Sequence, residues 1–249
     1  IEKIELITNP SAKFDAASSG GIINVVLKKN KRIGLNGVAS ISAGTPKLFS
    51  SNANLNFRQG KFNFFISAGH NQSGGIAKGN TLRQNKQGGV ITDYFNQYSV
   101  NERSRNHNSI RFGTDIFISN RNTVTITQSF NKGKFGNEEK QDQEYLNSSQ
   151  VLERYGTRTS EDESEFNRGS TALNYKFNFP KEGKELTADL SYNYGSRNSK
   201  SDIINNFYNP DGTDYQPQAI VWNYGSSNQK QMTAQLDYVN PVTEFTKVE

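Results

Sequence analysis

The chain has 249 residues, a formal net charge of +5, no cysteine and 2 histidines. Disulfides and thiolate metal sites are therefore excluded, and no metal or cofactor site is predicted. Hydrophobic residues make up 33% of the chain, but 16 Phe and 11 Tyr argue against a disordered protein. Acidic residues are interspersed with the basic ones, so nucleic acid is not an expected partner. We predict an all-β protein with few, regularly spaced apolar positions.

The first 31 residues differ from the rest of the chain. Residues 1–7 and the apolar run 22–27 are predicted to be two strands of a small sheet. Between them lie a turn signal, Asn9-Pro10, and the pair Gly20-Gly21, where the backbone can approach a neighbour closely. Because the chain begins with Ile, without a leader, and ends abruptly, we expect it to be an internal piece of a longer protein.

From residue 34 onward, apolar and polar residues alternate. Ala53, Leu55 and Phe57 alternate with asparagines, and the pattern recurs through residue 238. Successive side chains of a strand point to opposite faces, so each run has one apolar and one polar face. We predict about eight antiparallel strands of roughly 9–13 residues, longer than ordinary globular strands.

The predicted connections alternate in length. Short ones lie at residues 58–61, 119–122, 180–184 and 240–242, with the Gly, Pro and Asn of tight hairpins. Long loops are expected at residues 71–105, 132–165 and 195–229, and only residues 44–49 are brief on that side. This layout predicts a transmembrane β-barrel with short periplasmic turns and longer extracellular loops. A soluble antiparallel sandwich is the alternative.

Aromatic residues near the predicted strand ends fit the girdles of such a barrel. Phe57, Phe62 and Phe179 flank short turns, and Tyr192, Tyr194 and Tyr238 lie near other strand ends. Cross-strand aromatic packing would explain each of them equally well.

The opening segment resembles the end of the plug domain of TonB-dependent outer-membrane receptors, most closely the Bacteroidota type. The matching residues are Asn9, Pro10, Ser11, Ala12, Lys13, Phe14, Asp15, Gly20, Gly21 and Asn24, followed by the apolar strand and two lysines. Residues 17–19 depart from the family, which more often has Glu-Gly there.

The resemblance implies that residues 1–31 end a plug domain and that residues 32–249 form the first part of the barrel wall. It implies ligand uptake across the outer membrane of a Gram-negative bacterium, driven by the TonB system through a segment upstream of this sequence. Outer-membrane lipid and a surface lipoprotein are the other expected partners. The alternative functions are a non-transporting barrel (an adhesin or an assembly scaffold) and, less favoured, a barrel hydrolase.

No catalytic motif is recognisable, and the protein is not predicted to be an enzyme. His70 and His107 are the only candidates for a hydrolase site. Acidic residues at 138–144 and 161–163 could bind calcium, but a solvated loop explains them better. Aromatic residues of the predicted long loops are candidate extracellular-loop ligand contacts, with loop packing as the alternative: Tyr94, Tyr98, Tyr208, Tyr215 and Trp222.

Overall fold

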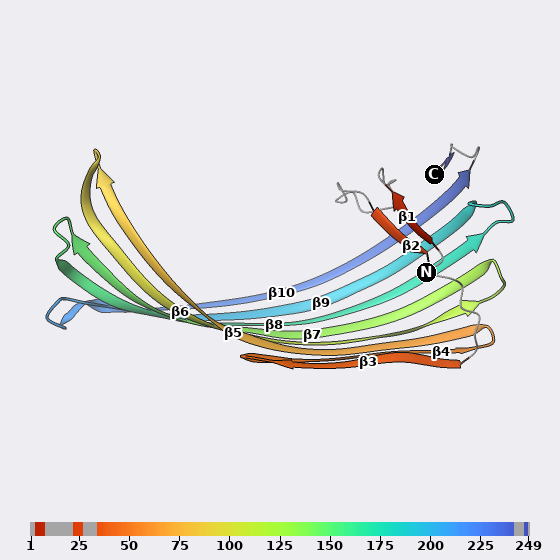
Figure 1. Ribbon diagram of the computed structural model, residues 1–249, viewed down its shortest axis with the longest axis horizontal. Helices are drawn as coiled ribbons and strands as arrows, with labels where there is room; N and C mark the ends of the chain where they lie inside the picture. Colours follow the sequence, from red (N-terminus) through yellow and green to blue (C-terminus); the bar gives the residue numbers. More distant parts are fainter. Residues whose placement is uncertain (1–2, 8–21, 27–33, 242–246, 249) are drawn as a thin grey trace.

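The structure is a computed structural model that describes residues 3–7, 22–26, 34–241 and 247–248. It is a long antiparallel sheet with a separate two-stranded sheet (Figure 1). The long strands are β3 (Gly34–Gly44), β4 (Lys47–Gln59), β5 (Phe62–Gln87), β6 (Val90–Phe117), β7 (Asn122–Asn147), β8 (Leu152–Asn178), β9 (Glu185–Tyr208) and β10 (Asp214–Pro241). Within these described parts, no helix is long and apolar enough to cross a membrane.

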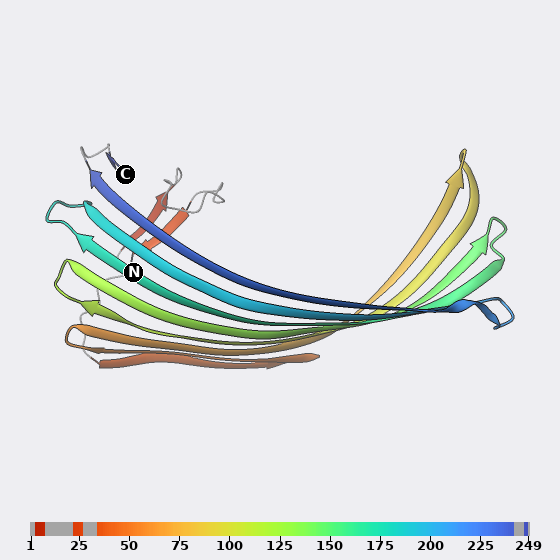
Figure 2. The ribbon, with the colours of Figure 1, turned by 180° about the vertical axis from the view of Figure 1, so that it is seen from behind.

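The strands of the large sheet follow their order in the sequence. Each strand from β3 to β10 pairs antiparallel with the next, and the short β11 (Lys247–Val248) pairs with the end of β10. The sheet is strongly twisted. At one end β10 is uppermost and β3 lowest, whereas at the other the β5–β6 hairpin is uppermost, and the view from behind agrees (Figures 1 and 2). The predicted set of about eight antiparallel strands is confirmed.

The predicted strand lengths and long loops are wrong. Strands β5 to β10 have 24 to 28 residues each. Most of residues 71–105, 132–165 and 195–229 are strand, joined by tight turns such as the two-residue connection Gly88-Gly89. Both of these glycines have positive φ, as a primed hairpin turn requires. We call this end of the sheet the extended end, and the end with the predicted short turns the short end.

The hairpin of β3 and β4 does not reach the extended end. Its turn lies at residues 45–46, and β4 begins at Lys47, opposite Gly74 of β5. Strand β5 continues from there to Gln87, paired only with β6 in its last part.

The registers place the alternating apolar residues on one face of the sheet. One row crosses eight strands through Leu35, Phe57, Phe64, Thr114, Ile126, Leu173, Leu190 and Ala234. Neighbouring rows form an apolar band next to the short end. The next row, which points to the opposite face, runs through Gly34, Arg58, Asn63, Asp115, Thr125, Asn174, Asp189 and Gln235. We call the face with the apolar band the outward face and the other the inward face.

The sheet curls toward its inward face. On β5 the outward residues Phe62, Phe64 and Ile66 are exposed, and the inward residues Asn63, Phe65 and Ser67 are half-buried. Among the described residues, no second layer covers either face of β5, so curvature that crowds inward side chains explains the difference. Apolar-out, polar-in strands with this curvature are those of an outer-membrane β-barrel wall.

Polar side chains on the inward face bond to each other across strands. Asp115 accepts hydrogen bonds from Asn63 Nδ2 (3.0 Å) and Thr125 Oγ1 (2.7 Å). Asn174 Nδ2 donates to Asp189 Oδ1 at 2.5 Å. These bonds satisfy part-buried polar groups that lie between neighbouring strands on the inward face.

Aromatic side chains gather at the short-end border of the apolar band. Phe177 and Phe179 are 4.5 Å apart between ring centroids, and Phe179 lies edge-on to Tyr238 at 5.9 Å. The Lys184 ammonium is 4.7 Å from the Phe179 ring. Cross-strand packing and a position suited to a membrane girdle therefore coincide here.

The opening segment forms its own sheet. Strand β1 (Lys3–Ile7) pairs antiparallel with β2 (Ile22–Val26), which confirms the two predicted strands. Asn24 lies in β2, opposite Glu5. The other residues of the plug-like motif, Asn9 to Asp15 with Gly20 and Gly21, lie outside the described residues, so their interpretation stays a prediction.

Asp211 holds the turn between β9 and β10. Its carboxylate accepts hydrogen bonds from the hydroxyl (2.6 Å) and the backbone N–H (3.0 Å) of Thr213. These bonds, the hydroxyl first, keep the pKa of Asp211 below its ordinary value of 3.8. A lowered pKa means that the stabilisation is complete above the ordinary value and is lost as pH falls through the folded-state pKa.

We therefore expect carboxyl NMR of the full-length protein to show Asp211 titrating below pH 3.8. Thr213→Val should raise the midpoint toward that value, while Thr213→Ser should preserve the low one. An unchanged midpoint in Thr213→Val would show that the Thr213 hydroxyl does not lower the pKa of the carboxylate.

Candidate functional site

The two basic residue types lie on opposite faces of the sheet. Every arginine within the long strands has inward register: Arg58, Arg83, Arg103, Arg105, Arg111, Arg154, Arg158, Arg168 and Arg197. Most strand lysines have outward register: Lys47, Lys78, Lys132, Lys134, Lys140, Lys200 and Lys230. Lys176, at the short end, is an inward exception and pairs with Glu185 at 2.5 Å.

The acidic residues form ion pairs with the lysines rather than with the arginines. Lys134 is 2.7 Å from Glu163, and Lys200 pairs with Asp202, all on the outward face. Arg58 apart, the inward arginines form no ion pair with another residue that the structure describes. The inward face therefore carries guanidinium groups whose charge is not neutralised by a protein carboxylate in contact.

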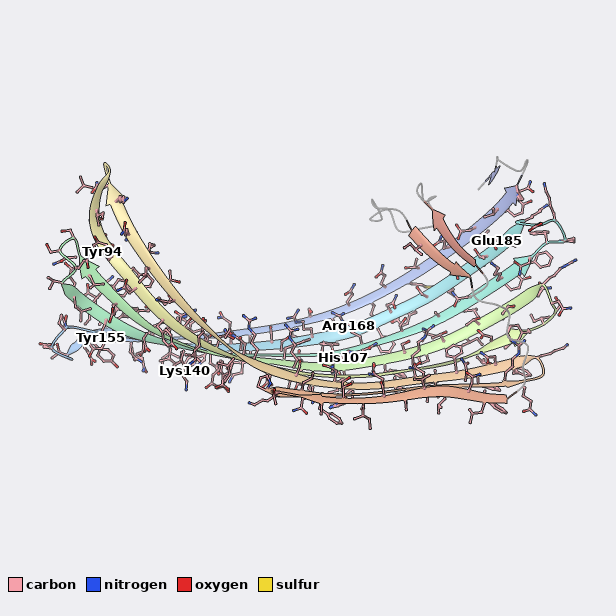
Figure 3. All side chains as sticks on the ribbon, viewed as in Figure 1. Tyr94, His107, Lys140, Tyr155, Arg168 and Glu185 are labelled. Carbon is pink, nitrogen blue, oxygen red and sulfur yellow. The ribbon has the colours of Figure 1, made fainter. Side chains whose placement is uncertain are left out.

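A cluster of arginine and phenylalanine side chains occupies the middle of the inward face. Its members are Arg105, His107, Phe135, Phe166, Arg168 and Arg197, from β6 to β9, and we call it the mid-sheet cluster. Figure 3 labels His107 and Arg168 midway along the sheet, far from Tyr94 at the extended end and Glu185 at the short end. The rings of Phe135 and Phe166 are stacked 5.7 Å apart.

The guanidinium groups surround these two rings. Arg105 lies 5.9 Å from the Phe135 ring and Arg168 lies 5.1 Å from the Phe166 ring. Arg197 Nε donates a hydrogen bond to Ser164 Oγ at 2.9 Å. Such contacts hold each side chain by one edge or face, which leaves the other guanidinium N–H groups directed at solvent.

Gly133 makes room for one of the rings. Phe166 is paired with Gly133 across β7 and β8, and a Cβ built on this glycine would lie 2.6 Å from Phe166 Cζ and closer still to Cε1. Any other residue at this position would push the Phe166 ring away from the sheet. The glycine thus fixes the ring flat on the inward face.

A cavity of about 610 Å³ adjoins the cluster on the same face. Arg103, Arg105, Phe135 and Arg197 line it, together with serines of β8 and β9. Two acidic residues, Asp162 and Glu163, also line the cavity, and Glu163 has outward register and pairs with Lys134. The Oδ2 atom of Asp162 accepts hydrogen bonds from Ser160 Oγ (3.0 Å) and Asn137 Nδ2 (3.3 Å), so this oxygen is engaged within the wall.

A second inward cluster, centred on Arg154, lies nearer the extended end. The Arg154 guanidinium is 4.2 Å from the Tyr145 ring and 5.0 Å from the Tyr215 ring, and it donates to the Tyr215 hydroxyl at 3.1 Å. Phe95, only 8% exposed, is 5.0 Å from Tyr145. These contacts join side chains of β6, β7, β8 and β10, and so they stabilise the packing of these strands near the extended end.

The predicted ligand contacts are strand residues and do not come together. Tyr94 and Tyr98 on β6, Tyr208 at the end of β9 and Trp222 on β10 all have outward register. Trp222 is 64% exposed, and Tyr208 stacks with Tyr155 at 5.3 Å. Only Tyr215 joins an inward cluster, through Arg154. Their assignment to loops is thus wrong, and their role in ligand binding stays a prediction.

The two histidines of the hydrolase alternative lie on opposite faces. His70 has outward register, with Nδ1 2.8 Å from Asn108 Oδ1, whereas His107 has inward register, 5.9 Å from the Phe166 ring. They cannot serve one reacting group. The acidic residues considered for calcium are also divided: Glu138, Glu161 and Glu163 are outward, but Glu139 and Asp162 are inward.

Sequence reasoning missed the mid-sheet cluster. One signal was available, because Arg111 lies between the outward residues Ile110 and Phe112 and is therefore inward. Extending that alternation along β6 places Arg105 and Arg103 on the same face. The contacts between Phe135 and Phe166, on different strands, depend on a register that the sequence does not display.

Residues 177–249, from the end of β8 onward, match the model of the outer membrane protein beta-barrel family. No curated protein and no solved structure matches the chain. The family match, the antiparallel strands and the apolar outward face define an outer-membrane β-barrel protein. Its location is the outer membrane of a Gram-negative bacterium.

Proposed function

We propose that the protein is a TonB-dependent outer-membrane receptor that takes up a ligand, with residues 1–31 as the end of its plug. The observation that carries this proposal is the pairing of β1 with β2 in a sheet of their own, ahead of the wall in the sequence. Transmembrane walls alone need no such element, whereas a plugged barrel has one inside its lumen. The resemblance of residues 9–24 to a plug end supports the same assignment.

The edges of the wall support a large barrel. Among the described residues, β3 pairs only with β4, and β10 is followed only by the short β11. Backbone groups left unpaired in lipid cost several kcal/mol each, so both edges need further strands at the level of the apolar band. In the proposed receptor these belong to the rest of a barrel of about 22 strands.

The proposed activity is transport without chemistry on the ligand. The polar inward face lines the path, and energy reaches the plug from the TonB system through a segment upstream of residue 1. A surface lipoprotein is the proposed partner at the extended end. The separation of His70 and His107 argues against the hydrolase alternative.

Ion conductance tests the proposal without knowledge of the ligand. In planar lipid bilayers, the full-length protein should conduct little, because the plug fills the lumen. The full-length protein without its plug, deleted from the start of the plug through residue 31, should form large, stable channels. Its folding can be verified by the shift in gel mobility on heating that folded barrels show.

A matched control shortens the turn at residues 209–213, which lies at the extended end, and should leave the low conductance unchanged. If the plug deletion folds but conducts no more than the intact protein, residues 1–31 do not close a lumen and the receptor assignment fails. A small barrel filled by its own side chains would give that result.

A further inference from the structure

We propose that the mid-sheet cluster binds the carboxylate or phosphate groups of an anionic ligand. The inference rests on the proposed function only in taking the inward face as the ligand's path. Its evidence is the arrangement of arginines on that face, their missing ion pairs and the adjoining cavity.

The placement of arginine follows from the chemistry of the two basic side chains. A guanidinium is a rigid planar fork that binds carboxylate and phosphate through two parallel hydrogen bonds and stacks on aromatic rings. Lysine is a flexible point charge, suited to a surface where its stem lies along apolar side chains. Lys132 and Lys230 lie just beyond the apolar band, on the outward face. The inward arginines thus have the chemistry of recognition and the outward lysines that of a membrane border.

Charge balance favours an anion over a neutral ligand. Arg105, Arg168 and Arg197 contact rings and a serine hydroxyl but no carboxylate of the described chain. Of the two acidic residues that line the adjoining cavity, Asp162 already accepts bonds from Ser160 and Asn137, and Glu163 pairs with Lys134 on the outward face. A ligand at the cluster therefore meets an excess of positive charge.

The two phenylalanines add a flat apolar surface between the charges. Phe135 is 38% exposed, and its ring is stacked with that of Phe166. A ligand with charged groups around an unsaturated or ring-shaped centre would place the centre on the rings and its oxygens toward the guanidinium groups. The cavity of about 610 Å³ is large enough for a molecule of that kind.

The second inward cluster is a poorer candidate. Arg154 lies between the rings of Tyr145 and Tyr215 and donates to the Tyr215 hydroxyl, and its Nε is buried, so little of its guanidinium is accessible to a ligand. Because this cluster joins side chains of β6, β7, β8 and β10, its role is structural. The free guanidinium surfaces are concentrated in the middle of the sheet.

Binding to the full-length protein in lipid nanodiscs tests the inference. The probes are citrate for the carboxylate arm, pyrophosphate for the phosphate arm and a neutral maltooligosaccharide, each measured by titration calorimetry at fixed ionic strength. We expect at least one anionic probe to bind. The variant Arg105→Gln/Arg168→Gln/Arg197→Gln should bind it at least about tenfold more weakly, because each lost charged hydrogen bond contributes on that scale.

The opposite face supplies a control of equal charge. Lys132→Gln/Lys140→Gln/Lys230→Gln removes the same net charge from the outward side of the same sheet, and its affinity for the probe should stay within about twofold of the wild type, because these charges lie on the far side of the wall. The variant with Arg105, Arg168 and Arg197 each replaced by Lys keeps the charge but loses the planar fork, so it should bind with intermediate affinity.

Three results would overturn the inference. One is that neither citrate nor pyrophosphate binds to the wild type. Another is an equal loss in the arginine and lysine variants, which would reduce the effect to net charge. The third is tighter binding of the neutral sugar than of both anions. Binding and conductance are separate readouts, so a barrel that binds anions but stays closed after plug deletion would refute only the proposed transport.

Discussion

Leu190→Arg is expected to destabilise the folded barrel by about 2–4 kcal/mol, the cost of arginine near the bilayer midplane. Leu190 lies in the middle of the apolar band, opposite Leu173 on β8 and Ala234 on β10, and its side chain is exposed on the outward face. In lipid, an arginine there must either lose its hydration or bend the membrane toward it. Urea titration of the full-length protein in lipid vesicles, followed by tryptophan fluorescence, measures the change.

The neighbouring residue provides the control. Ser191 has inward register and is half-buried beside Ala172 of β8. Ser191→Arg introduces the same side chain one position along the strand, but into the polar interior, so its cost should be clearly smaller. Equal costs for the two variants would mean that the apolar band does not face lipid.

Gly113→Ala is expected to cost about 1–3 kcal/mol, the range for overpacking a well-packed site. A Cβ on Gly113 would lie 2.5 Å from Phe65 Cζ and closer still to the backbone carbonyl oxygen of Ile126. The ring of Phe65 could turn aside, but the carbonyl belongs to the ladder between β6 and β7. Relief of the clash therefore requires the two strands to move apart.

Gly75→Ala is the matched control. Gly75 lies in β5 with inward register, and a Cβ there would meet nothing within 4 Å. Alanine should be neutral or slightly stabilising at this position, because it also restricts the unfolded chain. The same vesicle titration compares the two variants, and a Gly113→Ala barrel as stable as the wild type would show that the β6–β7 spacing adapts freely.

The fold class follows from the sequence because lipid and lumen impose opposite chemistry on successive residues. Ala53, Leu55 and Phe57 alternate with asparagine for that reason, and the structure places all three on the outward face. Where the strands leave the membrane, water contacts both faces, and the alternation disappears. Residues 71–105 were therefore predicted to be a loop although β5 and β6 run through them.

The candidate site was less accessible from the sequence. Aromatic residues such as Trp222 are conspicuous in a polar segment of the sequence, but the strand register places Trp222 on the outward face. The mid-sheet cluster joins residues from four strands, and Phe135 and Phe166 meet only because β7 and β8 pair in one register. The sequence does not display that register, because the pairing of β7 with β8 shifts between Tyr145 and Leu146, next to the turn at residues 148–151.

The short β3–β4 hairpin makes the rim of the wall uneven. Strand β4 stops opposite Gly74, but β5 continues for thirteen more residues, roughly 40 Å of extended chain. Over that length the free edge of β5 lies beyond the apolar band, where water can satisfy its backbone groups. The rim of the described wall is therefore lower at β3 and β4 than at β5 and β6. In the proposed receptor, this low part of the rim would be a side entrance for a ligand on its way to the inward arginines.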